Sequence, residues 1–416
     1  MDRSASGCPE VSARNQPGGR GFQGGEATIT GPHEAVKTAN PAWLGLVSSF
    51  QTGVFAGERI VHATLLPELH PEHAALRSFQ AGWPGALELS ERPDGLWSMV
   101  LREQVGPGPK VRWWIHVGLF ALTVLTTMGA GALMLGDDPF SMARLTLGPL
   151  AVPIPVGVDL RLLLTGAPFS ATLVCILLAH EMGHVIAARA HRVAATLPFF
   201  LPFPPYFSVV GTLGAFIRLR GALSRRSVLT DIGAAGPCAS FVLSVLALGW
   251  GLPRSTLVSG YADPWTPFAI AFMGQPIWLG AGPLTWVMGN LVLPGSLGDE
   301  LVRLHPVAFA GWLGLFITML NLLPFGQLDG GHILYGLLGR RQGRVGRGFL
   351  LLLLPLGFLW WGWWFWAVAA VLLSRGRMTH PDVLQPWEGL GPRRRLVALG
   401  AILIFFLCFS PVPIGF

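Results

Sequence analysis

The chain has 416 residues, of which 51% are hydrophobic and 12% are charged. Soluble globular proteins carry about 25% charged residues, so the composition excludes an ordinary soluble enzyme and indicates a membrane protein with several spans. The net charge of +7 comes from arginines beside apolar blocks and not from a basic polar domain. We therefore expect no nucleic-acid partner. Four cysteines are too few for a disulfide framework.

The N-terminal part of the chain lacks the long apolar blocks. Residues 1–57 are rich in Gly, Pro, Ser and Ala without periodicity, which is typical of a disordered tail. Residues 58–109 have the composition of a small soluble α+β module. Within it, 86–89 and 96–101 flank Arg92-Pro93-Asp94-Gly95, which predicts a hairpin. A module of this size has a marginal core, so we expect it to pack against another part of the chain.

Apolar segments of about 20 residues, the length that crosses a bilayer, fill the rest of the chain. Six are clear: 113–135, 167–188, 232–252, 305–323, 348–373 and the shorter 396–409. Two more, 145–164 and 264–293, are interrupted by Pro, Gly or charge and could span the bilayer, re-enter it or lie at its interface. The expected fold is an all-α polytopic membrane protein with six to eight spans, in which residues 336–416 form the C-terminal membrane helices.

The arginines predict the orientation. They cluster within 189–226 and 340–347, whereas 253–304 contains only two. The positive-inside rule then places these loops and the N-terminus in the cytoplasm, beside a cell (inner) membrane. The arginines after residue 373 would lie on the other side if 348–373 crossed once. Because tryptophans favour the interface, the run Trp360-Trp361-Gly362-Trp363-Trp364 leaves open a shallow hairpin that turns at Gly362.

A candidate metal motif, His180-Glu181-Met182-Gly183-His184, stands inside the segment 167–188. Residues four apart share a face of a helix, so His180 and His184 can present two imidazoles to one metal. Glu181 is placed to polarise a metal-bound water. The alternative is a chance match, but two histidines and a carboxylate inside hydrocarbon are costly unless they are paired or liganded. The setting therefore favours a functional site.

A third ligand should come from another helix, because a catalytic zinc commonly takes three protein ligands and leaves one position for water. Asn321-Leu322-Leu323-Pro324 leads into Leu328-Asp329-Gly330 at the end of the segment 305–323. By the orientation above, that end and His184 both lie near the cytoplasmic face. We therefore predict Asp329 as the third ligand.

These motifs resemble the site-2 protease family of intramembrane zinc metalloproteases over roughly residues 113–335, within an expected membrane catalytic core at residues 110–335. The segment 235–240, Ala-Gly-Pro-Cys-Ala-Ser, is similar to the family's AGPxAN segment, with Ser240 in place of the usual Asn. The Pro- and Phe-rich stretch 197–207 is closest to the bacterial and plastid branch named after the EGY proteins. The segment 253–304 is too short for the PDZ domain that many members carry there.

The resemblance implies one Zn²⁺ per chain, bound by His180, His184 and Asp329. It implies that Glu181 is the general base for a zinc-bound water that attacks the scissile peptide. Asn321 matches an Asn that binds the substrate backbone in this family, so the resemblance implies the same role for Asn321. The implied function is an intramembrane zinc endopeptidase that works in the lipid bilayer. Its implied partner is a single-span or other membrane protein, which it cleaves in a transmembrane or juxtamembrane segment.

A helical substrate has to unwind inside the protein, because backbone in lipid must satisfy its hydrogen bonds internally. Segments 197–203 and 212–219 flank a Pro-Pro turn and predict a short membrane-associated β-hairpin. Gly211 and Gly214 leave room for a neighbouring backbone, so an edge strand there could bind the unwound substrate. The alternative is an interfacial loop with phenylalanine anchors.

Two other functions compete with the protease hypothesis. One is a proteolytically inactive adaptor or chaperone on the same scaffold, and the other is a metal transporter that uses His180 and His184 as a transit site. The presence of all four reacting residues argues against the adaptor, and a transporter would not need Glu181. No motif indicates the substrate, the triggering signal or the oligomeric state.

Overall fold

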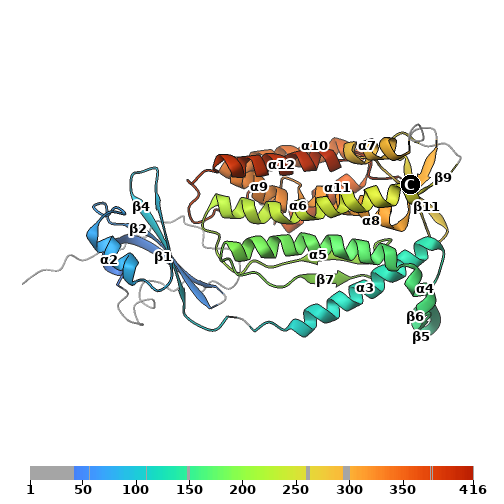
Figure 1. The fold of residues 1–416 in the computed structure, drawn as a ribbon, viewed down its shortest axis with the longest axis horizontal. Helices are drawn as coiled ribbons and strands as arrows, with labels where there is room; N and C mark the ends of the chain where they lie inside the picture. Colours follow the sequence, from blue (N-terminus) through green and yellow to red (C-terminus); the bar gives the residue numbers. More distant parts are fainter. Residues whose placement is uncertain are drawn as a thin grey trace, which may run out of the picture.

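The computed structural model describes residues 42–415 except 56, 109, 148–149, 259–262, 294–299, 375 and 377. The described chain forms an N-terminal β-module and a larger body of helices, joined by the segment between β4 (Trp97–Gln104) and α3 (Trp113–Leu135) (Figure 1). Most of the predicted disordered tail, residues 1–41, lies outside the described residues.

The N-terminal module is an antiparallel sheet in the order β1-β2-β4-β3. The predicted hairpin is present, because β3 and β4 pair from Ala86–Arg102 to Glu91–Trp97. Strand β1 lies in the range 1–57 that the sequence assigned to a disordered tail, and its pairing with β2 corrects that prediction for these residues. Its composition is that of a tail, but its backbone gains hydrogen bonds from a neighbouring strand. The elements are η1 (Leu44–Leu46), β1 (Val47–Phe55), β2 (Glu58–Leu65), α2 (Ala74–Gly82), β3 (Ala86–Glu91) and β4 (Trp97–Gln104).

The larger body contains three helices that are long and apolar enough to cross a membrane: α3 (Trp113–Leu135), α5 (Ala167–Ala190) and α6 (Arg226–Gly251). Two shorter helices, α8 (Pro306–Asn321) and α11 (Gly362–Leu373), are also apolar. The remaining helices of the body are α4 (Leu160–Thr165), α7 (Pro283–Val292), α8 (Pro306–Asn321), α9 (Asp329–Leu338), α10 (Gln342–Leu359), α11 (Gly362–Leu373) and α12 (Pro392–Cys408), with the short turns η2 (Pro205–Phe207), η3 (Leu252–Arg254) and η4 (Gly339–Arg341).

The predicted all-α fold with six to eight spans is wrong. The described residues contain three candidate spans, and they also contain 13 strands in four sheets. The apolar segment 145–164 lies mostly in a hairpin of β5 (Phe140–Leu147) and β6 (Leu150–Val158). Prolines inside Leu150–Val158 disfavour a continuous helix. A continuous apolar segment of this kind predicts burial, but its pattern does not by itself show whether the segment forms a strand or a helix.

The second doubtful segment, 264–293, contributes two strands to a mixed sheet and then forms α7. The sheet lies at the end of the helices that is far from the N-terminal module (Figure 1). Strands β10 and β12 run parallel, and the other pairs are antiparallel. The sheet has the order β13-β11-β10-β12-β9 and consists of β9 (Thr256–Val258), β10 (Phe268–Phe272), β11 (Gln275–Leu279), β12 (Leu301–Arg303) and β13 (Ile414–Gly415).

The segment 348–373 is a helical hairpin and not a single span, which confirms the alternative left open by the sequence. Helices α10 and α11 are separated by a break at Trp360–Trp361. Trp364 Nε1 donates to the Leu354 carbonyl across the hairpin at 3.0 Å. A Cβ at Gly357 would overlap the Trp364 indole, so this glycine lets the two arms meet.

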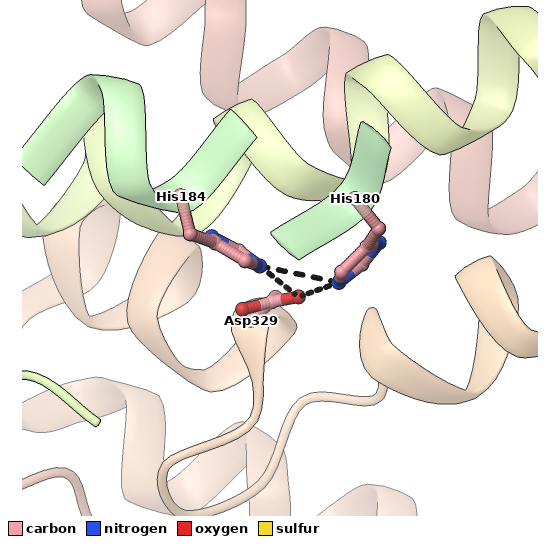
Figure 2. Close-up of side chains that lie close together, drawn as sticks. All are labelled: His180, His184 and Asp329. Atoms are coloured by element: carbon pink, nitrogen blue, oxygen red, sulfur yellow. Dashed lines mark hydrogen bonds and ion pairs between the residues drawn. The ribbon is translucent and has the colours of Figure 1, made fainter. Parts of the chain in front are cut away.

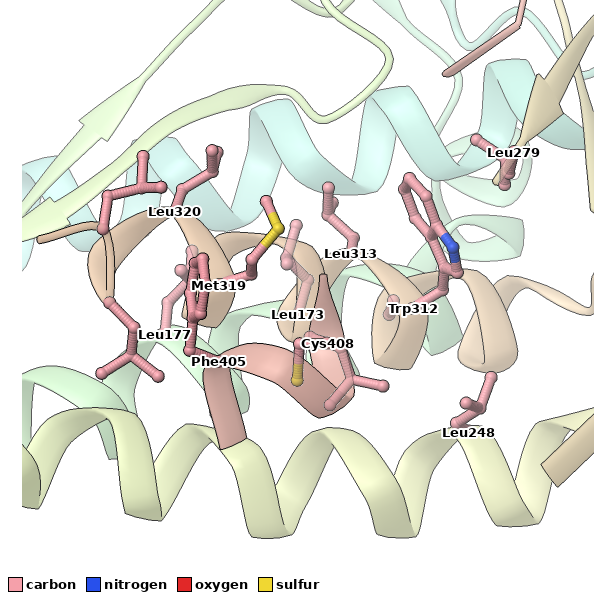
Figure 3. Packing of buried hydrophobic residues seen from close by; sticks show 14 of the residues in the cluster. Leu173, Leu177, Leu248, Leu279, Trp312, Leu313, Met319, Leu320, Phe405 and Cys408 are labelled. Atoms are coloured by element: carbon pink, nitrogen blue, oxygen red, sulfur yellow. The ribbon is translucent and has the colours of Figure 1, made fainter. Parts of the chain in front are cut away.

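The core lies where α5, α6, α8 and α12 meet (Figure 3). Small residues bring these helices close together. A Cβ at Gly311 would lie 2.6 Å from the Leu248 nitrogen, and one at Gly314 would lie 2.2 Å from Ser244 Oγ. The backbones of α8 and α6 therefore touch, which fixes the positions of the side chains between them.

The N-terminal module docks on the end of the bundle where α5 ends and α6 begins (Figure 1). The strap, residues 378–390 between α11 and α12, lies in the same contact. Arg225 joins the three parts, because its Nε lies 3.2 Å from Glu88 Oε2 of the module and 3.3 Å from Glu388 Oε2 of the strap. The buried side chains of Ile60, Val100 and Leu384 close the contact, as expected for a module with a marginal core.

Trp387 of the strap lies against the module. Its ring stacks on His62 with centroids 6.3 Å apart, and the Arg92 guanidinium lies 5.5 Å from its centroid. Burial, with the Arg92 charge nearby, lowers the pKa of His62 to about 4. His62 is therefore neutral at pH 7, and Arg92 is the charged group that faces Trp387 from the module.

Replacing Arg225→Gln should loosen the module from the bundle, because both ion pairs across the contact are lost. We expect tryptic cleavage at Lys110 or Arg112 to become several-fold faster, on the order of the change that one or two partly exposed ion pairs produce. Arg59→Gln is the matched control, since Arg59 pairs with Glu103 inside the module. Equal cleavage rates in the two variants would contradict the docking role of Arg225.

Candidate metal centre

Three potential metal ligands converge between α5 and the start of α9 (Figure 2). Nε2 of His180 lies 3.1 Å from Nε2 of His184. Asp329 Oδ2 lies 3.2 Å from the first of these atoms and 3.3 Å from the second. Both histidines are buried, and Asp329 is largely covered. The structure thus brings together the three residues that the sequence proposed as ligands.

Local structure explains how each ligand reaches this point. His180 and His184 are one helical turn apart on α5, so their side chains leave the same face. Asp329 is the first residue of α9, which follows a tight loop from the end of α8. A Cβ at Gly330 would lie 1.9 Å from the Leu322 carbonyl oxygen, and one at Gly331 would lie 2.5 Å from that of Gly326. The two glycines after Asp329 therefore allow the loop to fold onto the helix that carries it.

Each imidazole is oriented through its other nitrogen. His184 Nδ1 donates to the Ile232 carbonyl at 2.7 Å, because a carbonyl can only accept. His180 Nδ1 lies 3.0 Å from Ser240 Oγ. The Ser240 hydroxyl has three acceptors for its one proton: Thr318 Oγ1 at 2.9 Å and the Gly236 and Pro237 carbonyls at 3.2 Å. Because that proton is used there, the Ser240 oxygen accepts from His180 Nδ1. Both Nε2 atoms are then left without a proton, with lone pairs free for a metal.

Sequence reasoning missed the roles of Ser240 and Thr318. The one signal in the sequence is that Ser240 occupies the position of a motif Asn. In the structure its side chain bonds to His180. Thr318 lies on α8, and nothing in its sequence neighbourhood indicates that it faces α6. Its role depends on the packing of the two helices.

Glycines give the centre its close packing. A Cβ at Gly236 would lie 2.2 Å from His184 Nε2, so only a glycine leaves space for that ring. A Cβ at Gly183, between the two histidines, would lie 2.6 Å from the Ala235 carbonyl oxygen. The backbones of α5 and α6 therefore touch beside the metal ligands.

Glu181 is buried next to the three ligands, with 6% of its surface exposed. Its carboxylate accepts a hydrogen bond from the backbone N–H of Ile217. Ile217 directly follows β8 (Thr212–Phe216), which pairs with β7 (Phe199–Pro202) in an antiparallel hairpin. The hairpin lies between α5 and α3 (Figure 1). The predicted β-hairpin is thus present, and its second strand ends at Glu181.

The three residues predicted to bind substrate lie in different surroundings. Asn321, the last residue of α8, places Nδ2 3.3 Å from His180 Nε2. Gly211 packs against α3, because a Cβ there would lie 2.4 Å from the Thr126 carbonyl oxygen. Gly214 has a positive φ of 104°, and a Cβ there would meet nothing within 4 Å. Asn321 therefore lies at the centre, and Gly214 borders open space.

The donor set fits zinc. A tetrahedral zinc with bonds of about 2.0–2.1 Å holds its ligand atoms roughly 3.3 Å apart, and the three atoms here lie 3.1–3.3 Å apart. Asp329 supplies the carboxylate oxygen of the set, and a carboxylate binds a metal in its ionised form.

The part of the chain that holds this geometry matches a known protein family. Residues 168–353 match the model for peptidase family M50. The chain is 32% identical over 327 residues to "Probable zinc metalloprotease EGY1, chloroplastic" of Oryza sativa subsp. japonica, covering 76% of this chain and 53% of that protein. It is 31% identical over 249 residues to the Arabidopsis thaliana protein of the same name, covering 58% and 43%.

A third relative, "Probable zinc metalloprotease EGY2, chloroplastic" of Arabidopsis thaliana, is 28% identical over 263 residues, covering 62% of this chain and 44% of that protein. The chain thus spans about half the length of the curated relatives it matches. No solved structure matches the chain. The match to residues 168–353 includes His180, Glu181, His184 and Asp329. The chain therefore carries a domain of peptidase family M50, the site-2 protease family, and is a homologue of the EGY zinc metalloproteases.

Proposed function

We propose that this protein is an intramembrane zinc endopeptidase that cleaves a transmembrane or juxtamembrane segment of another membrane protein. The observation that carries the proposal is the convergence of His180, His184 and Asp329 beside a buried Glu181. Three of these residues lie on α5, a helix long and apolar enough to cross a membrane. The family match supports a metalloprotease, and the position on α5 supports cleavage at membrane depth.

The zinc would be held by His180 Nε2, His184 Nε2 and one Asp329 carboxylate oxygen. When bound, zinc supplies a Lewis acid that polarises the scissile carbonyl and lowers the pKa of a water toward about 7. The bonds from the Nδ1 atoms to Ser240 and the Ile232 carbonyl hold the rings in place and keep both Nε2 atoms unprotonated. Such outer hydrogen bonds typically change metal affinity 10- to 100-fold.

Glu181 acts as the general base. Its carboxylate takes the proton from the attacking water and passes it to the leaving amine nitrogen. The hydrogen bond from the Ile217 N–H fixes the carboxylate without neutralising it, so the carboxylate stays able to accept a proton. Asn321, whose Nδ2 lies 3.3 Å from His180 Nε2, is close enough to donate to a substrate carbonyl held at the same point.

The hairpin of β7 and β8 supplies a place for an unwound substrate. Strand β8 pairs with β7 on one side, and no other strand of the described residues pairs with it. We propose that an extended substrate segment adds to β8 by main-chain hydrogen bonds. Because Ile217 follows β8 and bonds to Glu181, a segment aligned along β8 would run toward the catalytic carboxylate. Gly214 would border this segment.

The membrane placement follows from the same helices. We propose that α3, α5 and α6 cross the bilayer and that the metal centre lies near the end of α5 that faces the N-terminal module. By the positive-inside rule, the arginines at this end would face the cytoplasm, and this orientation stays a prediction.

The central test is cleavage of co-expressed single-span membrane proteins. Wild type should produce fragments whose new ends map within or beside the span, and Glu181→Gln should lower the cleavage rate at least about a hundredfold while zinc is retained, because a general base contributes 10²–10⁴. Glu91→Gln, at an exposed position in the module, should cleave at the wild-type rate. Full activity of the Glu181 variant would refute the mechanism and leave the adaptor hypothesis in place.

Metal analysis tests the ligand set independently of any substrate. Purified wild type should contain near one zinc per chain, and Asp329→Ala should lose most of it, because two histidines alone hold zinc weakly at a site built for three ligands. Asp137→Ala, at the end of α3, removes the same charge away from the centre and should keep its zinc. Equal zinc content in both variants would exclude Asp329 as a ligand.

Ser240→Ala tests the orienting hydrogen bond. It should weaken zinc binding about 10- to 100-fold without unfolding the protein, since one hydroxyl is removed. Ser244→Ala is the matched control, because Ser244 is also buried on α6 and bonds to the Ser240 carbonyl but not to a histidine. A competition titration with a chelator measures both affinities, and indistinguishable values would show that Ser240 does not tune the centre.

A further inference from the structure

A pocket of about 450 Å³ opens beside the C-terminal end of α9. It lies on the same side of the molecule as the N-terminal module but contains none of the metal ligands. Its walls come from three parts of the chain that are distant in sequence: the start of α6, the end of α9 with η4, and the strap. The residues that carry its chemistry are Arg226, Tyr335, Arg340, Arg341 and Trp387.

The pocket has a surplus of positive charge. Arg340 is paired, because its Nε lies 3.1–3.2 Å from both oxygens of Asp382. Arg226 Nε donates to the Gly336 carbonyl at 2.9 Å, and its terminal nitrogens have no acceptor among the residues that the structure describes. Arg341 is exposed and has no ion-pair partner within the same described residues. Three guanidinium groups thus face one carboxylate.

Two of the three arginines, Arg226 and Arg340, are held in place by neighbouring groups. Arg226 is anchored by its bond to Gly336, and a Cβ at Gly339 would lie 3.5 Å from its guanidinium carbon. This guanidinium therefore lies flat against the end of α9. The Tyr335 hydroxyl donates to Asp382 at 2.8 Å, which fixes the carboxylate that holds Arg340.

The strap supplies an aromatic wall with a donor that has no acceptor. The Trp387 ring is held against the module by His62 and Arg92. Its Nε1 is buried and makes no hydrogen bond with the described residues. The pocket thus combines two guanidinium groups that lack a counter-charge, those of Arg226 and Arg341, with an aromatic wall.

We propose that this pocket binds a phosphate group, carried either by an anionic lipid headgroup or by a soluble phosphate compound. Guanidinium groups bind phosphate in planar, bidentate pairs, and two of them here lack a counter-charge. The volume lies in the range of sites for small molecules. The site does not depend on the proposed peptidase function, because no residue of the metal centre lines it.

The test uses the purified full-length chain in detergent and two probes. Calorimetry with inorganic pyrophosphate measures a soluble phosphate, and native mass spectrometry with short-chain phosphatidylglycerol measures a lipid headgroup. Short-chain phosphatidylcholine, which has no net charge, is the comparison lipid. Binding of pyrophosphate alone assigns a soluble ligand, and binding of phosphatidylglycerol alone assigns a lipid.

Arg341→Gln should weaken binding of the preferred probe about tenfold, the loss expected for one charge-assisted hydrogen bond, and Arg226→Gln/Arg341→Gln should weaken it further. Arg341 has no partner in the described structure, so its single variant keeps the proposal testable if the double variant does not fold. The control Arg344→Gln/Arg347→Gln removes two nearby charges outside the pocket and should bind within about twofold of wild type.

Three results would overturn the proposal. Wild type binding neither probe would exclude a phosphate site. An equal loss in the control double variant would indicate a diffuse positive surface and not a pocket. Phosphatidylcholine binding as tightly as phosphatidylglycerol would show that the pocket does not select a headgroup with a net negative charge.

Discussion

The constraint on which this structure depends is the burial of two histidines and two carboxylates among apolar helices. Such groups are costly in a low-dielectric setting unless every polar atom has a partner. His180 bonds to Ser240, His184 to the Ile232 carbonyl, and Glu181 to the Ile217 N–H. The unprotonated Nε2 atoms of both histidines and Oδ2 of Asp329 lie close together, and a zinc ion would bind between these three atoms. The centre is therefore specified by its surroundings as much as by its ligands.

These hydrogen bonds form only if the backbones of neighbouring helices approach each other closely. Glycines make this possible at Gly183 and Gly236, where α5 meets α6, and at Gly311 and Gly314, where α8 meets α6. Each one brings a carbonyl, a hydroxyl or a ring to a distance that a Cβ would block. The same helices form the main hydrophobic core (Figure 3). Packing and polar satisfaction are thus two consequences of one arrangement of helices.

Helix α9 connects the two sites discussed above. It begins at Asp329, in the metal centre, and ends beside the arginine pocket. The strap packs along it and also contacts the N-terminal module, with Arg225 joining module and strap at the start of α6. The end of the bundle next to the metal centre is therefore assembled from the module, the strap and two helix termini, and a change in any one part bears on its neighbours.

The sequence by itself determined the features that depend on local geometry. His180 and His184 share a helix face because they are four residues apart, and Arg92-Pro93-Asp94-Gly95 turns a hairpin because of its residue types. The meeting of Asp329 with α5 also followed, from charge at the helix ends. Only the tertiary structure decided that 145–164 and 264–293 contain strands, that Ser240 and Thr318 orient His180, and that three distant segments form the arginine pocket. The physical reason is that an apolar segment specifies burial but not which residues it will contact. The neighbour of a strand, the partner of a buried hydroxyl and the opposite wall of a pocket all lie far away in the sequence.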